Sequence, residues 1–322
     1  MTTAPVNIGL IGLGPYWDNQ YRPALAKLKQ RLRVVAVYDN VRSRAEQAAR
    51  ETQSHVVGGI TALVSRPDVQ AVMWLDAGWQ GAAIMSMLLD RRKPVLLGAK
   101  SGLSSSALQV IYQQATTHGQ IIVPAFPKRG TPASIRLQEL LATQLGRPQH
   151  IEIQIAPTSL SAVPFATSAD FGGVEPPSQN PLLEWSDWVQ YLFRSAPQTV
   201  NFANNNQSLL LEFAPTISTD TTASEPTKSR SAKLSICSTP PITDQPACDE
   251  VRVQCEHGTA RLIGSSKIEW TCGEDSSSET LTNERTEIEV LLDLFCRRVL
   301  GSLVPVPDLS DLIRAMQIVD RV

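Results

Sequence analysis

The chain has 322 residues, of which 42% are hydrophobic and 19% charged, and its formal net charge is −2 at pH 7. This length suits two domains of about 100–200 residues each, with enough apolar material for substantial cores. So small a net charge gives no electrostatic footprint for nucleic acid or for an acidic membrane surface. No run approaches the ~18 consecutive apolar residues of a membrane span, and residues 1–14 lack the basic start of a secretory signal. We therefore expect a cytoplasmic protein with neither a nucleic-acid nor a membrane partner.

The cysteines agree with a reducing compartment. Their number is odd and no C-x-x-C pair occurs, so the sequence predicts neither a disulfide framework nor a metal site. Most of them stand in strand-like sequence, where a free cysteine is usually a small buried hydrophobe. The five are Cys237, Cys248, Cys255, Cys272 and Cys296.

Short apolar, β-branched runs alternate with helical segments through the first half of the chain. The predicted strands are 6–13, 32–38, 69–75, 94–97 and 120–125. The predicted helices are 23–30, 43–51, 81–89 and 105–117. Continuous apolar strands separated by helices are typical of a parallel sheet covered on both faces. The sequence therefore predicts an α/β fold whose first domain, 1–125, is a doubly wound Rossmann domain.

The second half predicts an α+β domain, 126–322, built on a largely antiparallel open sheet. A helix is expected at 182–193, and two more, 287–300 and 309–322, close the chain; the last is a candidate to pack back on the first domain. The expected strands begin near Thr199 and continue at 208–213, 232–238, 250–255, 259–263 and 267–271. Residues 156–181 are expected to form a loop, and 216–231, rich in Ser and Thr, an exposed one.

A glycine turn after the first strand is the clearest chemical feature. Gly12 and Gly14 would permit a tight turn and a close approach of the backbone to a pyrophosphate at the start of a helix. Asp39 ends the second strand, where a carboxylate can accept from ribose hydroxyls. Tyr16 and Asn40, which neighbour these positions along the chain, complete this part of a predicted dinucleotide site.

The motif is imperfect at its third glycine position. Trp17 stands there, or Asp18 if Pro15 is an insertion, where a small residue normally lets helix and strand pack closely. The alternative interpretation is therefore a Rossmann turn that has lost its ligand. Asp39 favours NAD, while nearby Arg42 and Arg44 leave room for the 2′-phosphate of NADP or are ordinary solvated charges.

Several segments resemble the Gfo/Idh/MocA oxidoreductases. In the first half these are VNIGLIGLG, VVAVYDNVRSRAEQAA, SRPDVQAVMW and RRKPVLL. In the second half LGRPQHIEI, DEVRVQCEHGTARLIG and VPVPDLSDLIRAMQIVDRV resemble the crossover, a pair of sheet strands and the closing helix. The resemblance implies NAD(P)-linked oxidation or reduction of a small hydroxy or carbonyl compound, and a homo-oligomer formed through the second sheet.

The catalytic positions of that family are altered here. The family's Glu-Lys-Pro after the fourth strand falls, without a gap, on Gly98 and Ala99, so Lys100 can replace the lysine only if the chain bulges by one residue. The loop histidine after the third strand is replaced by Gln80, which could still bind the cofactor by hydrogen bonds. On the helix of the second domain, Glu184 keeps the family's acid, but Trp188 stands at its proton donor. Indole is no acid or base near neutral pH, and no histidine lies in 151–256.

Other residues of that helix could line a substrate pocket. Asp187 and Tyr191 share the general face of Glu184 and Trp188. Trp188 could stack on a flat ligand or pack in a core, whereas Trp185 is predicted to pack. Lys128 and Arg129, after the fifth strand, could hold an anionic substrate or form a solvated basic turn.

Two functions follow from these observations. The first is an NAD(P)-dependent oxidoreductase with an atypical site, since the cofactor carries out the hydride transfer and water or a substrate group could replace a missing acid. The resemblance also implies this, because the family includes bilin reductases that depart from the Lys/His arrangement. The second is a non-catalytic dinucleotide-binding sensor or scaffold, motivated by the joint alteration of three catalytic positions.

Overall fold

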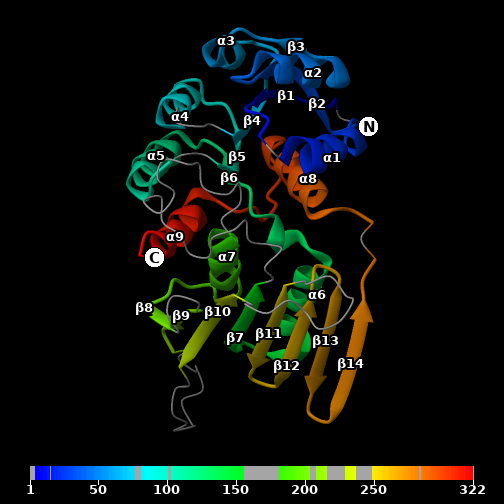
Figure 1. The fold of residues 1–322 in the computed structure, drawn as a ribbon, viewed down its shortest axis with the longest axis vertical. Coiled ribbons are helices and arrows are strands. Elements are labelled where there is room, and N and C mark those ends of the chain that lie inside the picture. The colour runs from blue at the N-terminus through cyan, green and yellow to red at the C-terminus, as the bar shows by residue number, and fades with distance from the viewer. Residues whose placement is uncertain are drawn as a thin grey trace. The chain divides into compact units, whose positions relative to one another are not determined.

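The computed structural model describes residues 4–14, 16–76, 81–100, 103–155, 181–203, 208–215, 229–236, 249–282 and 284–321. The chain forms two compact units, drawn in Figure 1. Unit 1 comprises Met1–Pro127 and Arg285–Met316, and unit 2 comprises Lys128–Glu284 and Gln317–Val322.

Unit 1 is built on a six-stranded parallel sheet. Its strands are β1 (Val6–Ile11), β2 (Leu32–Tyr38), β3 (His55–Val56), β4 (Ala71–Asp76), β5 (Val95–Lys100) and β6 (Ile122–Pro124). They run in the order β3-β2-β1-β4-β5-β6. The strands after β1 are added first on one side of it, as β2 and β3, and then on its other side, as β4 to β6. This confirms the predicted Rossmann sheet and puts the end of β1 at the topological switch point, where such folds bind ligands.

The helices of unit 1 follow the predicted alternation of strands and helices, to which the structure adds the short strand β3 and the short helix α3. They are α1 (Arg22–Lys27), α2 (Arg42–Thr52), α3 (Ile60–Val64), α4 (Gly81–Asp90), α5 (Ser105–His118), α8 (Glu287–Val299) and the first part of α9 (Leu309–Val319). The short elements β3 and α3 were not predicted, because two and five residues give too little periodicity to detect. Helix α1 begins one residue before the predicted segment 23–30 and ends at Lys27, and a π-helical turn, Trp17–Tyr21, precedes it.

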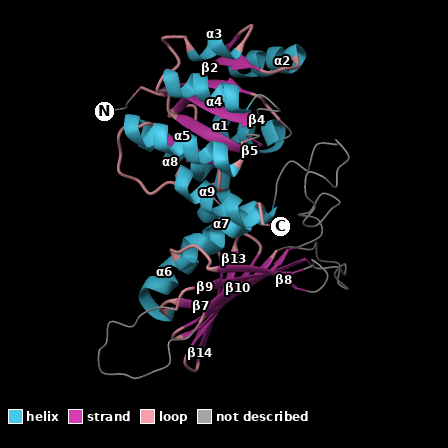
Figure 2. Cartoon of the chain, turned by 90° about the vertical axis from the view of Figure 1, so that its left-hand side faces the viewer, coloured by secondary structure: helices cyan, strands magenta, loops and turns pink. Residues whose placement is uncertain are grey.

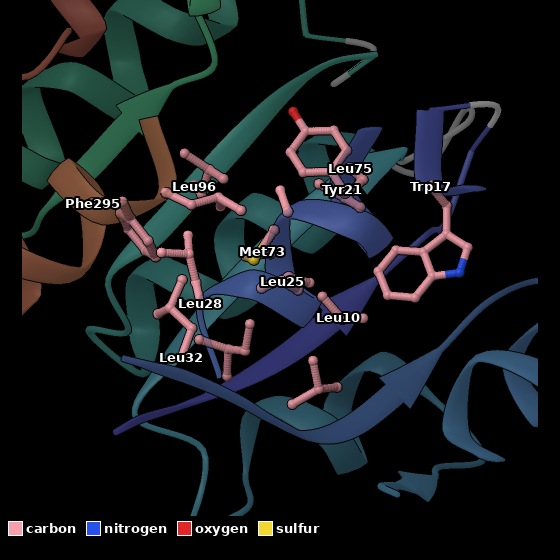
Figure 3. Close-up of a cluster of buried hydrophobic side chains, with 14 of the residues drawn as sticks. Leu10, Trp17, Tyr21, Leu25, Leu28, Leu32, Met73, Leu75, Leu96 and Phe295 are labelled. Carbon is pink, nitrogen blue, oxygen red and sulfur yellow. The ribbon is translucent and has the colours of Figure 1, made fainter. Parts of the chain in front are cut away.

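One core of unit 1 brings together side chains from β1, β2, β4, α1 and α8. Figure 3 shows Leu10, Leu25 and Met73 within this cluster, with Phe295 of α8 beside Leu96. Phe295 is fully buried there. Burial of a Phe side chain contributes about 1.5–3 kcal/mol, so α8 is an integral part of unit 1.

The domain boundary therefore differs from the sequence-based expectation. The first break lies at 127/128 instead of 125/126, and α8 belongs to unit 1 although the sequence analysis assigned it to the second domain. Ion pairs explain the attachment: Lys27 Nζ lies 2.7 Å from Glu289 Oε1, and Arg31 pairs with Asp293. Within α9 the unit changes after Met316.

Asp293 is expected to contribute strongly to the stability of unit 1. Its buried carboxylate pairs with Arg31, with Arg297 at 2.9 Å and with Arg285 at 3.6 Å. Asp293→Asn removes the negative charge with which these three guanidinium groups pair. We expect the free energy of unfolding, measured by urea denaturation, to fall by about 1–3 kcal/mol. Asp18→Asn is the matched control, because that side chain is 64% exposed and its Arg22 partner lies 3.6 Å away. An equal loss in both variants would contradict the assigned role.

Unit 2 is built on an eight-stranded sheet. The strands are β7 (Pro148–Ile155), β8 (Thr199–Ala203), β9 (Ser208–Phe213), β10 (Arg230–Ile236), β11 (Glu250–Cys255), β12 (Gly258–Ile263), β13 (Lys267–Cys272) and β14 (Asp275–Thr280). Their order is β14-β13-β12-β11-β7-β10-β9-β8, and neighbouring strands are antiparallel except for β7 and β10, which are parallel. The predicted, largely antiparallel sheet is confirmed.

Two helices lie on the same face of this sheet, as Figure 2 shows: α6 (Pro132–Leu140) and α7 (Pro181–Phe193). Helix α6, which continues into a π-helical turn, Leu141–Leu145, was not predicted, and neither was β14. Strand β14 has the sequence DSSSET, whose polar residues carry no alternating pattern. Both expected loops, 156–181 and 216–231, fall outside the described residues except at their ends, where Pro181 begins α7 and Arg230 begins β10.

Two of the three described cysteines agree with the predicted packing role, and the third, Cys272, is only partly buried. Cys255 and Cys296 are buried thiols, and burial raises the pKa of the Cys255 thiol to about 12. Cys237 and Cys248 lie outside the described residues. Within the part of the chain that the structure covers, no helix is long and apolar enough to cross a membrane.

Candidate active site

The glycine turn after β1 has the backbone geometry that a dinucleotide requires. Gly12 and Gly14 have φ of +63° and +61°, in the left-handed region that favours glycine. A Cβ on Gly12 would lie 1.6 Å from the carbonyl oxygen of Asp76, and one on Gly14 would lie 3.1 Å from the Asp76 Cβ. The turn is therefore packed against the end of β4, and neither the conformation nor the space at Gly12 accepts a side chain.

Asp39 holds this turn to the end of β2. Its Oδ2 accepts from the Leu13 N–H at 2.8 Å, and its Oδ1 accepts from the Val41 N–H at 2.7 Å. Arg44 Nε lies 3.4 Å from the same Oδ1, and the residue is 8% exposed. The sequence analysis predicted Asp39 as a ribose acceptor. The structure gives both carboxylate oxygens a partner within the protein, so any ribose contact would be additional to this positioning role.

Trp17, at the third glycine position, is accommodated in the core. It is 4% exposed and stands at the start of the π-helical turn before α1, and Figure 3 shows it at the side of the cluster. A π turn carries one more residue per hydrogen-bonded loop than an α turn, which gives the bulky indole room between helix and strand. Tyr16 packs partly against the same core, and Asn40 is exposed, accepting from the Tyr38 hydroxyl at 3.0 Å.

Strand β5 contains the one-residue bulge that Lys100 needs. Trp74 of β4 is opposite Leu97 of β5, and Asp76 is opposite Lys100. Two residues along β4 therefore correspond to three residues along β5. Gly98 lies at the irregularity, where a Cβ would come within 2.5 Å of the Leu75 carbonyl oxygen. A glycine therefore replaces the family's glutamate where the two backbones approach closely. In backbone register, Lys100 takes the place that residue 99 would hold in a regular ladder.

The bulge also brings Lys100 to the cofactor turn. Asp76 is its partner in the ladder, and the same Asp76 lies against Gly12 and Gly14. Gln80, the other predicted cofactor residue from this region, lies outside the described residues. The backbone of unit 1 thus places the glycine turn and Lys100 at the carboxyl ends of β1 and β5, the two strands that flank β4.

The predicted pocket residues of unit 2 form two adjacent ion-pair groups. Arg129 makes two hydrogen bonds to Asp187, at 2.8 and 2.5 Å, and its guanidinium lies 4.5 Å from the Tyr191 ring centroid. The side chains of Arg129 and Asp187 are only 14% and 2% exposed. Of the two interpretations that the sequence left open for Arg129, the low exposure of its side chain does not agree with a solvated basic turn.

Lys128 belongs to the second group. Its Nζ lies 3.2 Å from Asp249 Oδ2, 3.9 Å from Glu184 Oε2 and 4.2 Å from the Trp185 ring centroid. Asp249 was missed by sequence reasoning because it precedes β11, more than a hundred residues away along the chain, in no motif. Within the described part of the chain, the two groups together hold two cations and three carboxylates.

Trp188 is enclosed in the core of unit 2. It is 1% exposed, its Nε1 donates to Ser134 Oγ at 2.9 Å, and its ring meets that of Trp185 edge to face at 5.4 Å. The structure favours the packing interpretation that the sequence left open, and it gives no access for stacking on a ligand. Among the residues described, no group of three or more His, Cys, Asp or Glu is arranged to hold a metal ion.

The two tryptophans of α7 make a matched test of this packing. The Trp185 Nε1 is buried and has no hydrogen-bond partner among the described residues, whereas the Trp188 Nε1 donates to Ser134 Oγ. Phenylalanine removes the N–H in each case, so we expect Trp188→Phe to lower the free energy of unfolding by about 1 kcal/mol more than Trp185→Phe does. Chemical denaturation of both variants measures the difference, and a larger loss in Trp185→Phe would contradict the hydrogen bond.

Residues 6–124 match the Gfo/Idh/MocA family, described as an oxidoreductase family with an NAD-binding Rossmann fold. This segment is a Gfo/Idh/MocA Rossmann domain. The chain is also 31% identical over 150 residues to an inositol 2-dehydrogenase of Acidothermus cellulolyticus, a match that covers 46% of this chain and 44% of that relative. The matched part is thus less than half of the relative's length.

Solved structures extend the likeness in fold to the whole chain. A UDP-N-acetylglucosamine 3-dehydrogenase of Acidithiobacillus ferrooxidans has a TM-score of 0.75 at 15% identity, covering 99% of this chain and 97% of its own. A Synechocystis biliverdin reductase, solved with biliverdin and NADP⁺, has a TM-score of 0.69 at 14% identity and covers 99% and 98%. These similarities show that the fold of the chain, unit 2 included, occurs in other solved proteins.

Proposed function

We propose that the chain is an NAD(P)-dependent oxidoreductase acting on a small, uncharged hydroxy or carbonyl compound. The observation that carries this proposal is the convergence on Asp76: the glycine turn packs against it, and Lys100 is its ladder partner. With the irregularity in β5, Lys100 takes the ladder position of residue 99, and this supports a catalytic lysine near the glycine turn. This favours an enzyme over the sensor or scaffold.

The turn fits a dinucleotide, because side chains are excluded where a pyrophosphate would approach the backbone. A bound nicotinamide supplies the hydride chemistry. Gly12 and Gly14 would hold the pyrophosphate, with Tyr16 and Gln80 nearby in sequence. Asp39 would hold the turn in shape, and Lys100 would polarise the reacting oxygen and hold or move its proton. We place no catalytic role on Trp188.

Charge at the turn favours NAD over NADP. The Asp39 carboxylate is beside the turn, and Arg42 Nε lies 2.9 Å from Glu46 Oε1 while Arg44 lies near Asp39. Both arginines that could meet a 2′-phosphate are therefore engaged with carboxylates of the chain. We expect NADH to bind more tightly than NADPH.

Charge in unit 2 indicates the substrate class. Among the described residues, the group of Lys128, Glu184 and Asp249 and the pair of Arg129 and Asp187 hold three carboxylates and two cations. Carboxylates accept hydrogen bonds from hydroxyl groups and repel anions. The substrate that this supports is a neutral polyol or sugar.

A panel of neutral polyols and two anionic compounds tests the proposal. With NAD⁺ or NADH, turnover should be found with myo-inositol and related neutral polyols, and be weaker or absent with UDP-N-acetylglucosamine and biliverdin, which are anionic. Dinucleotide binding without turnover of any polyol would instead support the sensor. Preferential reduction of biliverdin would contradict the charge argument.

A further inference from the structure

A cavity of about 680 Å³ lies within unit 2, away from the ion-pair groups just described. It lies among the end of α6 and its π-helical turn, the start of β7, the end of α7 and the start of β10, which are labelled in Figure 1. Its charged lining residues are Arg147, Arg194, Arg230 and Glu256, and Leu192 and Phe193 are part of its apolar wall. The volume is in the range of pockets that enclose small molecules, about 300–1,000 Å³.

Arg230 is held in this wall by neutral groups. Its Nε donates to the Ala214 carbonyl at 2.8 Å, its Nη1 to the Phe193 carbonyl at 3.1 Å, and its Nη2 to Ser195 Oγ at 3.2 Å. Burial, and secondarily the charge of Arg147, lower the pKa of this guanidinium from its usual value. The protein thus fixes a half-buried cation without giving it a carboxylate partner.

The other two arginines are also without an acidic partner. In the described parts of the chain, no carboxylate lies within 4.0 Å of the guanidinium of Arg147, Arg194 or Arg230. Buried or clustered like charges are unfavourable unless a counter-charge is present. Arg230 is half-buried whereas Arg147 and Arg194 are exposed, so the lining of the cavity carries an excess of positive charge that an anion would neutralise.

Arg194 is kept at this position at a cost. It follows the last residue of α7 with φ of +52°, where helices commonly end in glycine. A left-handed conformation costs an ordinary L-residue about 1–2 kcal/mol. Arginine in place of glycine turns the helix end into part of a charged wall.

Glu256 limits the positive charge without cancelling it. Its Oε2 accepts from the Arg147 backbone N–H at 2.9 Å, and a Cβ on Gly146 would come within 2.8 Å of the same oxygen. The carboxylate is thus held by the backbone beside the cavity. Three guanidinium groups with one carboxylate leave an excess that two negative charges would balance.

We propose that this cavity binds a small organic dianion, with its apolar body on Leu192 and Phe193 and its anionic group, a phosphate monoester or a pair of carboxylates, on the arginines. Guanidinium groups suit both, since their planar forks bind phosphate and carboxylate oxygens in pairs. The residues that line the cavity all belong to unit 2 and the dinucleotide turn belongs to unit 1, and the proposal does not depend on the activity proposed above.

Isothermal titration of the full-length protein tests it, with phenyl phosphate and phthalate as probes. These two aromatic dianions distinguish the phosphate from the dicarboxylate source, and benzyl alcohol serves as the neutral analogue. Each titration is run with and without NADH, so that binding at the dinucleotide turn is recognised by competition. We expect one dianion to bind with a Kd below about 1 mM, unaffected by NADH, and the alcohol not to bind.

Variants assign the binding to the arginines. In the double variant Arg147→Gln, Arg194→Gly we expect the Kd to rise about tenfold or more. The glycine relieves the left-handed strain and so preserves the fold. Arg92→Gly is the matched control, because Arg92 is an exposed residue with φ of +51° in unit 1. The proposal would be overturned if neither dianion bound, if NADH displaced the probe, or if the double variant bound it as tightly as the wild type.

Discussion

In Gly12→Ala, binding of nicotinamide dinucleotides is expected to be lost. The new Cβ would stand 1.6 Å from the Asp76 carbonyl oxygen, in a residue with φ of +63°. Relief requires movement of the turn away from β4, and this disrupts the backbone that would approach the pyrophosphate. We expect the Kd for NADH to rise at least about 100-fold, and the free energy of unfolding to fall by about 2–4 kcal/mol. NADH fluorescence titration and urea denaturation measure the two effects.

Gly119→Ala is the control that tests the effect of a left-handed backbone conformation without a steric clash of the new Cβ. Gly119 also has a left-handed φ, +62°, at the end of α5, but no atom lies within 4 Å of a Cβ built there. This control should lose only about 1 kcal/mol of stability and bind NADH as the wild type does. Unimpaired NADH binding in Gly12→Ala would show that the turn is not the dinucleotide site.

The second large effect is expected from Lys100→Met. If Lys100 polarises the reacting oxygen and handles its proton, its loss should lower kcat by about 10²–10⁴-fold. The Kd for NADH should change by less than about twofold, since a methionine leaves the glycine turn intact. The measurement is steady-state turnover of the neutral polyol found in the panel, together with NADH titration.

Lys29→Met is the control for this substitution. Lys29 is an exposed residue beyond the end of α1, so its loss should leave kcat and the Kd unchanged. Full turnover in Lys100→Met would remove the lysine from the proposed mechanism. A parallel loss of NADH binding would mean that its effect is on the turn instead.

The periodic parts of the fold could be predicted from the sequence. Strands such as Leu32–Tyr38 and Ser208–Phe213 begin and end where their apolar patterns do, because burial on a sheet face dictates those patterns. Strand β14 could not be found this way, since an exposed strand of Ser, Asp and Glu owes its conformation to its pairing with β13. The attachment of α8 to unit 1 depends on Asp293 and Phe295 meeting residues far away in the chain.

Only part of the candidate site could be predicted from the sequence. The positions of Gly12 and Gly14 follow from local turn chemistry, which the sequence carries. Whether Lys100 could replace a lysine expected at residue 99 depended on a bulge, and the clue was Gly98, a residue without a side chain at a crowded strand end. The pairing of Arg129 with Asp187 and of Lys128 with Asp249 is tertiary, and no spacing along the chain encodes it.

Equilibrium binding of the four nicotinamide dinucleotides to the wild-type protein tests the central claim most directly. NADH, NAD⁺, NADPH and NADP⁺ are titrated in turn, with NADH fluorescence and the Tm of the protein as readouts, because a ligand that binds only the native state must raise its stability. The account predicts saturable binding of NADH at micromolar concentration, a raised Tm, and weaker binding of NADPH. No binding of any of the four up to millimolar concentration would contradict it.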